Sequence, residues 1–266
     1  EAGAIVIYGV MAYKTHAKMM HIVRRERGRL RHYAHLGTGN YHSRTAKLYT
    51  DYSLLTADPV LCADVHKVFQ QLSGMGRARH IEQLLHAPFT LHEQMVAKID
   101  REAEHARKGK RAHLIIKCNS LTEPKLIQAL YRASRAGVEC DLIIRGMCCL
   151  RPGIPGISEN IRVRSIIGRF LEHTRVFHFH NDGKSETWGS SADFMARNMF
   201  HRVETCFPLL DKKLAARVRK DLETYLVDNC QSWLLRSDGL YVKQEPGSAA
   251  PISAQETLLY AYASKS

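Results

Sequence analysis

The sequence predicts an α/β protein with mixed sheets flanked by helices and an internal duplication. Segments that begin at helix-capping residues alternate with short apolar runs, which indicates alternating helices and strands. An ordered pattern of strand, histidine, cation, hairpin and glycine-rich loop also occurs twice, around His16 and around His173. Each element of this pattern is weak alone, but two copies in the same order predict two domains related by a pseudo-twofold axis.

Four longer helices are predicted from their caps. Asp58 before Pro59 is a typical N-cap and first helical residue, and Thr90 and Ser120 each open a capping box with an acid three positions later. The expected helices cover 58–74, 90–108, 120–136 and 211–233, followed by a loose Pro/Gly/Ser segment over 244–253 and a short terminal helix.

Short apolar runs between these helices are predicted to be strands. They are rich in β-branched and aromatic residues, which fit a pleated and half-buried surface. The expected strands lie at 4–8, 113–117, 140–144, 161–166 and 175–179.

The duplication is visible in the order of its parts. In the first copy these are a strand from Ala4, His16-Ala-Lys18, a turn at 26–28 and a loop at 37–40 that ends in Asn40. In the second copy they are a strand from Ile161, His173-Thr-Arg175, a turn at 181–183 and a loop at 189–193 that ends in Asp193.

The same duplication sets the expected domain boundary. Residues 1–86 would form the first domain and residues 87–266 the second. A helix and a strand ending at Arg145 precede the second motif, and their counterparts in the first copy would lie before Glu1. We therefore expect the first domain to be truncated on its N-terminal side.

Composition limits the class of protein. The chain has 266 residues, 45% of them hydrophobic, and no apolar run approaches the roughly 18 residues that a membrane span needs. Seven cysteines without a CxxC pair favour a reduced interior. The expected compartment is the cytoplasm, with peripheral association at the inner face of the membrane left open.

The charge is strongly basic. Lys and Arg number 39 against 26 Asp and Glu, a formal net charge of +13. A positive field concentrates polyanions such as nucleic acid, anionic lipid, nucleotides or polyphosphate. Composition alone does not choose among them, and a merely solubilising excess of cations is also open.

The paired motifs suit phosphoryl transfer. On an extended strand, side chains two positions apart share a face, so His16 would lie beside Lys18 and His173 beside Arg175. Neutral imidazole is a competent nucleophile near pH 7. The cations and the loop hydroxyls would stabilise charge on the phosphoryl oxygens, and the second histidine would orient the group or handle a proton.

The arrangement resembles the phospholipase D superfamily, which implies two phospholipase D-like domains. That family carries an Asp soon after the motif lysine, where this chain has Val23, so ordinary phosphodiester hydrolysis is disfavoured. The surrounding sequence segments resemble those of the phosphohistidine-type polyphosphate kinases. These segments are Lys14–Met19, Tyr33–Tyr41, Thr45–Asp58, Leu142–Cys148, Leu171–Arg175 and Ser190–Asn198.

The resemblance implies transfer of the ATP γ-phosphoryl group to inorganic polyphosphate, reversibly, through a phosphohistidine at His16 assisted by His173. Mg²⁺ would accompany ATP, and no metal ligands are assigned in this chain. The implied partners are ATP, ADP, polyphosphate and a second copy of the chain, with no specific nucleic acid. The implied nucleotide- and phosphate-binding residues are Tyr49, Arg145, His173, Lys18, Arg175 and Asn40.

The two histidines have different neighbours in sequence. Glu172 precedes His173, whose loop ends in Asp193, whereas no acid lies within the segment Lys14–Met19 around His16. A carboxylate on imidazole favours its protonated form. We therefore expect His173 to be the protonated partner and His16 to carry the phosphoryl group.

Two other functions are left open. One is a phospholipase D-like phosphodiesterase acting on lipid or nucleic acid, and the other is a polyanion-binding module without chemistry. A metal pair at His178 and His180 is a weak third idea, because the same spacing fits a polar strand face.

Overall fold

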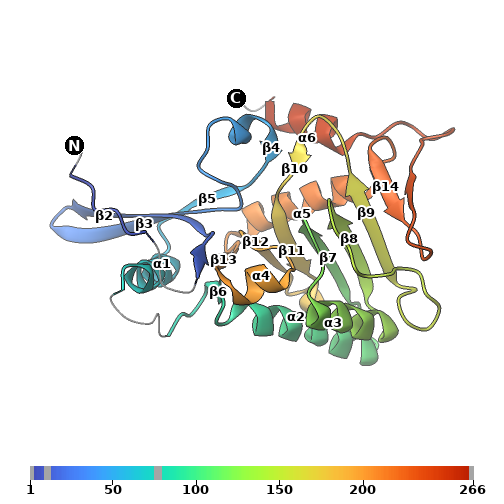
Figure 1. Cartoon of the computed structure of the whole chain (residues 1–266), viewed down its shortest axis with the longest axis horizontal. Helices are drawn as coiled ribbons and strands as arrows, with labels where there is room; N and C mark the ends of the chain where they lie inside the picture. Colours follow the sequence, from blue (N-terminus) through green and yellow to red (C-terminus); the bar gives the residue numbers. More distant parts are fainter. Residues whose placement is uncertain (1–2, 9–12, 75–79, 264–266) are drawn as a thin grey trace.

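The computed structural model describes residues 3–8, 13–74 and 80–263. Helices cover both faces of a large mixed sheet, and a smaller antiparallel sheet with a helix of its own lies to one side (Figure 1). The predicted α/β class with mixed sheets is confirmed. Within the described ranges, no helix combines the length and apolarity needed to cross a bilayer.

The large sheet contains ten strands. They are β1 (Lys14–Thr15), β6 (Leu85–Ala87), β7 (His113–Cys118), β8 (Glu139–Ile144), β9 (Ile161–Ile166), β11 (Arg175–Phe179), β12 (Glu186–Ser190), β13 (Arg202–Pro208), β14 (Ser232–Leu235) and β15 (Tyr241–Lys243). Their order is β1-β13-β12-β11-β7-β8-β9-β14-β15, and β6 pairs with β13. The strands β7, β8 and β9 are parallel, whereas β11, β12 and β13 are antiparallel.

Helices bury the two faces of this sheet in separate cores. On one face lie α2 (Leu91–Arg107), α3 (Pro124–Arg135) and the short α4 (Ala196–Phe200), and on the other lie α5 (Lys212–Leu226) and α6 (Ala254–Ala263) (Figure 1). Side chains alternate between the faces: Leu114 and Ile116 join the first core, and Ile115 joins the second.

The smaller sheet repeats part of the larger one. It consists of β2 (Lys18–Glu26), β3 (Arg29–Gly37) and β5 (Ser53–Thr56), in the antiparallel arrangement also seen for β11, β12 and β13. Its core is covered by α1 (Pro59–Leu72), as α5 covers part of the larger sheet. The remaining elements are η1 (Thr45–Lys47), β4 (Tyr49–Thr50), β10 (Leu171–Glu172) and η2 (Asn181–Gly183).

Three predicted helix starts are confirmed, at Asp58, Thr90 and Asp211, and one changes. Asp58 and Asp211 cap α1 and α5 through their carboxylates. Glu123 rather than Ser120 caps α3, because Pro124 takes the first helical position and disfavours helix in the residues before it. Thr90 precedes α2 without a side-chain cap, since its hydroxyl accepts from the His86 N–H instead.

Two other predictions are wrong. Residues 4–8 form no strand, because nothing in the described part of the chain pairs with their backbone, and their large apolar side chains are exposed. The helix expected over 211–233 ends at Leu226, because the Asp228 carboxylate accepts from the N–H groups of Cys230 and Gln231 and turns the chain. Residues Ser232–Leu235 then pair with β9.

Candidate active site

The two histidine motifs lie at the starts of the hairpins, and each is held by the other copy. His16 lies between β1 and β2, and its N–H donates to the carbonyl of Val203 in β13 at 2.9 Å. His173 lies between β10 and β11, and its N–H donates to Thr50 Oγ1 at 3.2 Å. The parallel pairing of β1 with β13 and of β10 with β4 thus draws each motif onto the opposite copy.

Each imidazole donates through Nδ1 to a carboxylate from that opposite copy. His16 Nδ1 donates to Glu204 Oε2 at 2.9 Å. His173 Nδ1 lies 2.9 and 3.0 Å from the two carboxylate oxygens of Asp51. A carboxylate on Nδ1 fixes the proton there and leaves the lone pair on Nε2. Both histidines are therefore set in the tautomer that a nucleophile requires.

The glycine-rich loops supply the hydroxyls that hold these carboxylates. Thr38 Oγ1 donates to Asp51 Oδ1 at 2.7 Å, and Ser191 Oγ donates to Glu204 Oε2. In both pairs the acid follows the hydroxyl by 13 residues. Glu204 is fully buried and also accepts from Asn198 Nδ2 at 2.6 Å. The two copies therefore exchange equivalent hydroxyl–carboxylate pairs.

The motif cations lie beside their histidines, as predicted. Lys18 is buried and donates through Nζ to the carbonyl of His16. Arg175 is buried as well, and its Nη1 donates to His173 Nε2 at 2.9 Å while Nε and Nη2 donate to Asp193 at 3.1 Å. Nothing in the described ranges contacts His16 Nε2 in this way. The two imidazoles are thus unequal, because only that of His16 leaves Nε2 unoccupied.

The charges that act on Lys18 come from both copies. The pKa of this amine is lowered to about 8, and burial is the largest cause. Arg175 and Arg202 add to the lowering, whereas Glu204 and Asp51 oppose it. The charged groups of the two motifs therefore share one electrostatic environment, in which the ammonium is poised to lose its proton at mildly alkaline pH.

The acids expected around His173 lie elsewhere. Glu172 forms a buried ion pair with Lys117 at 2.8 Å, and Asp193 is engaged by Arg175. The carboxylate that His173 does contact, Asp51, comes from the first copy.

The expected protonation of His173 is also wrong. Burial lowers the pKa of this imidazole, although the hydrogen bond to Asp51 acts in the opposite direction. The neutral form is therefore favoured. His16, for which no acidic neighbour was expected, contacts Glu204. The changed acid partners of both histidines have the same cause, because strand pairing across the chain selects them rather than adjacency along it.

The implied nucleotide residues occupy different places. The Tyr49 ring is half-buried, and its centroid lies 5.0 Å from that of His173, so it borders the site rather than filling a core. Asn40 is exposed, its carbonyl accepts from the His42 N–H, and its side chain has no hydrogen-bond partner in the described ranges. The geometry thus brings Tyr49 to the histidines but gives Asn40 no direct contact with them.

Arg145 is connected to Arg175 through Asn119 and Asp193. It follows the carboxyl end of β8, where its Nε donates to Asn119 Oδ1 at 3.0 Å. The Asn119 N–H donates to Asp193 Oδ1 at 2.8 Å, and Asp193 accepts from Arg175. Ligands of α/β folds gather at the carboxyl ends of parallel strands, which is where this side chain emerges.

Comparison with known proteins identifies the family. Two family models match: "Polyphosphate kinase C-terminal domain 1" over residues 1–78 and "Polyphosphate kinase C-terminal domain 2" over residues 84–255. The chain belongs to the polyphosphate kinase family. Polyphosphate kinases from Pseudomonas aeruginosa and Pseudomonas syringae are 61% and 62% identical to it, each over 97% of this chain. The crystal structure of polyphosphate kinase from Porphyromonas gingivalis superposes with a TM-score of 0.90 at 37% identity over 96% of the chain.

The chain spans only part of these polyphosphate kinases. It covers 38% of the Pseudomonas aeruginosa protein, 35% of the Pseudomonas syringae protein and 40% of the Porphyromonas gingivalis chain. The first matched segment contains His16 and the second contains His173. The proposed boundary between residues 86 and 87 stays a prediction.

The site contains residues that the sequence motifs did not reveal. Asp51 and Glu204 lie beyond the duplicated motifs, which close at Asn40 and Asp193, although Asp51 falls within the segment Thr45–Asp58. A signal was nevertheless present: an acid follows the loop hydroxyl by 13 residues in both copies. Comparing the copies beyond the closing loop could have found both acids.

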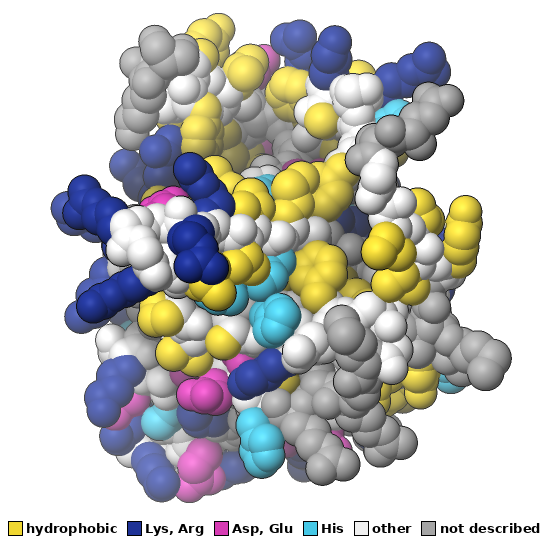
Figure 2. All heavy atoms as spheres, turned by 90° about the vertical axis from the view of Figure 1, so that its left-hand side faces the viewer, with side chains coloured by type: hydrophobic (Ala, Val, Ile, Leu, Met, Phe, Trp, Pro, Cys, Tyr) yellow, Lys and Arg dark blue, Asp and Glu magenta, His cyan; other side chains and the backbone are white. Residues whose placement is uncertain are grey.

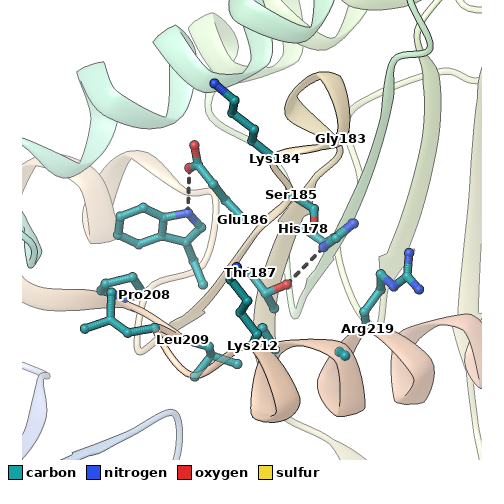
Figure 3. Close-up of a pocket in the computed structure, with 14 residues that line it drawn as sticks. His178, Gly183, Lys184, Ser185, Glu186, Thr187, Pro208, Leu209, Lys212 and Arg219 are labelled. Atoms are coloured by element: carbon teal, nitrogen blue, oxygen red, sulfur yellow. Dashed lines mark hydrogen bonds between the residues drawn. The ribbon is translucent and has the colours of Figure 1, made fainter.

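A cavity of about 680 Å³ lies at the other end of the β11–β12 hairpin (Figure 3). His178, Thr187, Lys212 and Arg219 are among the residues that line it. His178 forms a hydrogen bond with Thr187 at 3.0 Å, and burial lowers the pKa of its imidazole to about 4. His178 is thus a buried polar group of the hairpin. The described ranges contain no group of three or more His, Cys, Asp or Glu side chains arranged to hold a metal ion.

Proposed function

We propose that this chain carries the catalytic part of an ATP:polyphosphate phosphotransferase that works through a phosphohistidine at His16. The observation that supports the assignment most is the contrast between the two imidazoles. His16 has Nδ1 fixed by Glu204, and Nε2 has no partner in the described part of the chain, whereas His173 Nε2 accepts from Arg175. Membership of the polyphosphate kinase family supports the choice of substrates.

The reaction has two displacements. The Nε2 lone pair of His16 attacks the γ-phosphorus of ATP, a P–N bond forms, the bond to the β-phosphate oxygen breaks, and ADP leaves with that electron pair. A terminal oxygen of polyphosphate then attacks the same phosphorus, and the P–N electrons return to Nε2. The Nδ1 proton stays in place, and Glu204 offsets the positive charge that the imidazole acquires. The reverse sequence makes ATP from ADP.

The surrounding side chains have separate tasks. Lys18 and Arg175 stabilise charge on the transferred group, because both cations are buried beside the histidines. Neutral His173 orients Arg175 through Nε2, and it is held in turn by Asp51. Tyr49 offers a ring beside His173 for the nucleotide.

The remaining proposed ligands lie farther out. Arg145 would bind nucleotide phosphate from the carboxyl end of β8, and Asn40 would bind phosphate from the first glycine-rich loop. Mg²⁺ would enter with the triphosphate, whose oxygens are its preferred ligands. The carboxylates nearest the histidines do not fit a metal-binding role, since Asp51 and Glu204 are both engaged by an imidazole and a hydroxyl.

The decisive experiment is incubation of the full-length protein with ATP labelled at the γ-phosphate. Label retained on protein, stable in alkali and lost in acid, is expected on the peptide that contains His16. His16→Gln should abolish labelling and polyphosphate synthesis, whereas His173→Ala should slow labelling without moving it. His105→Gln is the control, because this histidine lies on α2 and contacts Asn181, away from both motifs.

Other outcomes would contradict the proposal in distinct ways. Label on the His173 peptide with His16 unmodified would reverse the roles of the two histidines. Release of products from a phosphodiester substrate, without retained label, would favour a phospholipase D-like hydrolase. If neither phosphoenzyme labelling nor hydrolysis is found, but polyanions bind tightly, the chain would be a binding module.

The oligomeric state and the location of the enzyme are proposed from the family resemblance and from the net charge. Self-association of the full-length protein should appear as a mass above that of the monomer in light scattering. We propose a cytoplasmic protein, whose net charge of +13 would favour loose attachment to anionic membranes. Release from such membranes by moderate salt, without detergent, is the expected result.

A further inference from the structure

The tip of the β2–β3 hairpin, which comprises the turn and the adjoining strand ends, carries a dense group of arginines. Arg24, Arg25, Arg27, Arg29 and Arg31 are all exposed, and the single acid among them is Glu26. Figure 1 shows this hairpin projecting from the rest of the molecule, and Figure 2 looks onto that side, where Lys and Arg side chains gather along one flank. We call these five residues the arginine tip.

Most of the positive charge of the arginine tip is uncompensated. Glu26 is shared between Arg24 at 3.6 Å and Arg31 at 3.8 Å, distances typical of loose surface pairs. Arg25, Arg27 and Arg29 have no acidic partner in the described ranges. Three guanidinium groups are thus free to meet an anion from solution.

The backbone of the turn shows that this charge is placed at a conformational cost. Arg27 and Gly28 both have positive φ, 49° and 78°, as a two-residue hairpin turn requires. Asn, Asp and Gly suit the left-handed region, whereas arginine is disfavoured there. The second copy uses Asn181 and Asp182 with positive φ at its hairpin turn. An unfavourable residue at an exposed position points to a function for the side chain.

The hairpin joins the arginine tip to the histidine site. Lys18 pairs with Gly37 at the site end, and Glu26 pairs with Arg29 at the tip. Eight steps along a strand span about 27 Å. A cavity of about 570 Å³, lined in part by Arg31, His32 and His66, lies beside the tip. An extended polyanion held at the site by one end could therefore reach these cations with a more distant part.

We infer that the arginine tip is a second binding site for polyphosphate, which holds the chain away from its reacting end. This inference rests on the proposed function. Two attachments raise the effective concentration of the chain end at His16, because release from one contact no longer frees the substrate. The tip would therefore retain long chains and be indifferent to short ones.

Polyphosphate fits the tip better than nucleic acid or a membrane does. Guanidinium groups bind phosphate oxygens bidentately. Residues 24–31 contain no aromatic ring on which a base could stack, and stacking supplies much of single-strand binding. Leu30 is their one large apolar side chain, and with the exposed Ile22 and Val23 that precede them the apolar surface stays small beside five arginines, too little for insertion into a bilayer. Polyphosphate has neither bases nor an apolar part, so cations alone are enough to bind it.

The test compares two triple variants of the full-length protein. One is Arg25→Ala/Arg27→Gly/Arg29→Ala, in which Gly suits the positive φ of the turn. The control is Lys125→Ala/Lys220→Ala/Lys243→Ala, which removes three exposed lysines that lack ion pairs in the described ranges and lie on separate elements. Both variants lose the same charge. Affinity for long-chain polyphosphate and for tripolyphosphate is measured over a series of KCl concentrations.

The tip variant should bind long-chain polyphosphate roughly ten- to hundredfold more weakly at moderate salt, because three ionic contacts are lost. For the same reason, the slope of log affinity against log salt concentration should flatten by about 2. The control variant should keep most of both values. Tripolyphosphate, which is too short to span the hairpin, should bind the tip variant and the wild type alike. Unchanged affinity and slope for the long chain in the tip variant would overturn the inference.

Two further measurements separate the inference from its alternatives. Labelling by γ-labelled ATP should be normal in the tip variant, so a failure of the phosphohistidine proposal is seen independently of the binding result. Loss of single-stranded RNA or anionic vesicle binding, with polyphosphate binding intact, would reject polyphosphate as the ligand. Should the tip variant fail to fold, hydrogen exchange on the wild type decides: polyphosphate must protect residues 20–34, and equal exchange with and without it overturns the inference.

Discussion

Glu204 accepts a hydrogen bond from His16 Nδ1 at 2.9 Å across 188 residues of sequence. Three side chains determine where this carboxylate lies, since Ser191 and Asn198 also donate to it. The equivalent relationship joins His173 to Asp51 and Thr38. Each copy therefore contributes a histidine to its own motif and an acid to the motif of the other.

Glu204→Gln should slow phosphoenzyme formation by at least about 10²-fold, because a neutral amide no longer fixes the Nδ1 proton or offsets charge on His16. The thermal midpoint should change little, since Gln keeps the size of the side chain. Rapid-quench measurement of the labelling rate tests this. Glu186→Gln removes an acid that pairs with Lys98 and Arg101 and should leave the rate unchanged. A wild-type rate in Glu204→Gln would show that the acid is structural only.

Gly39→Ala should disable the His173 side of the site. A Cβ at position 39 would lie 2.1 Å from Asp51 Oδ2 and 2.2 Å from its Cγ, so the carboxylate must move away from His173 and Thr38. We expect turnover to fall about 10²-fold or more, because misplaced catalytic groups are costly. Ser43→Ala, an exposed change in the same loop, is the control. Full activity in Gly39→Ala would mean that Asp51 does not position His173.

The pH dependence should report Lys18. With its pKa lowered to about 8, the ammonium loses its proton as the pH rises through that value, so kcat/KM for ATP should decline above about pH 8. Lys18→Arg should keep the charge and move this decline to higher pH. Stability should change in the opposite direction. The unfolded chain holds this proton more tightly than the folded one, so the contribution of Lys18 to stability rises between about pH 8 and its ordinary pKa of 10.5.

Loss of activity in step with loss of stability over this range would contradict the assignment to Lys18. Parallel pH titrations of kcat/KM and of the urea midpoint distinguish the two cases.

Arg145→Ala should raise the KM for ATP by about 10- to 100-fold, the value of a charge-assisted hydrogen bond to phosphate, with a smaller effect on kcat. Arg145→Lys should recover only part of the loss, because an ammonium lacks the guanidinium fork. Initial rates over a range of ATP concentrations give both constants. A large drop in thermal stability with unchanged ATP kinetics would mean that the contact with Asn119 is structural.

The sequence by itself determined much of the local structure. Asp58 and Asp211 mark helix starts because a short carboxylate can accept from backbone N–H groups one turn on, which is a local interaction. The repeated order of motif, hairpin and loop placed Lys18 and Arg175 beside their histidines, because the two members of each pair are two residues apart. The α/β class follows from the same local patterns.

Only the tertiary structure decided which acid meets which histidine. Neighbours in an extended chain point to opposite faces, so the Glu172 carboxylate contacts buried Lys117, Thr50 and Gln255 of α6 rather than the imidazole of the adjoining His173. Asp51 and Glu204 reach the imidazoles because β10 pairs with β4 and β1 with β13. Such pairings join residues more than 100 positions apart. They depend on how whole sheets pack, which no local pattern records.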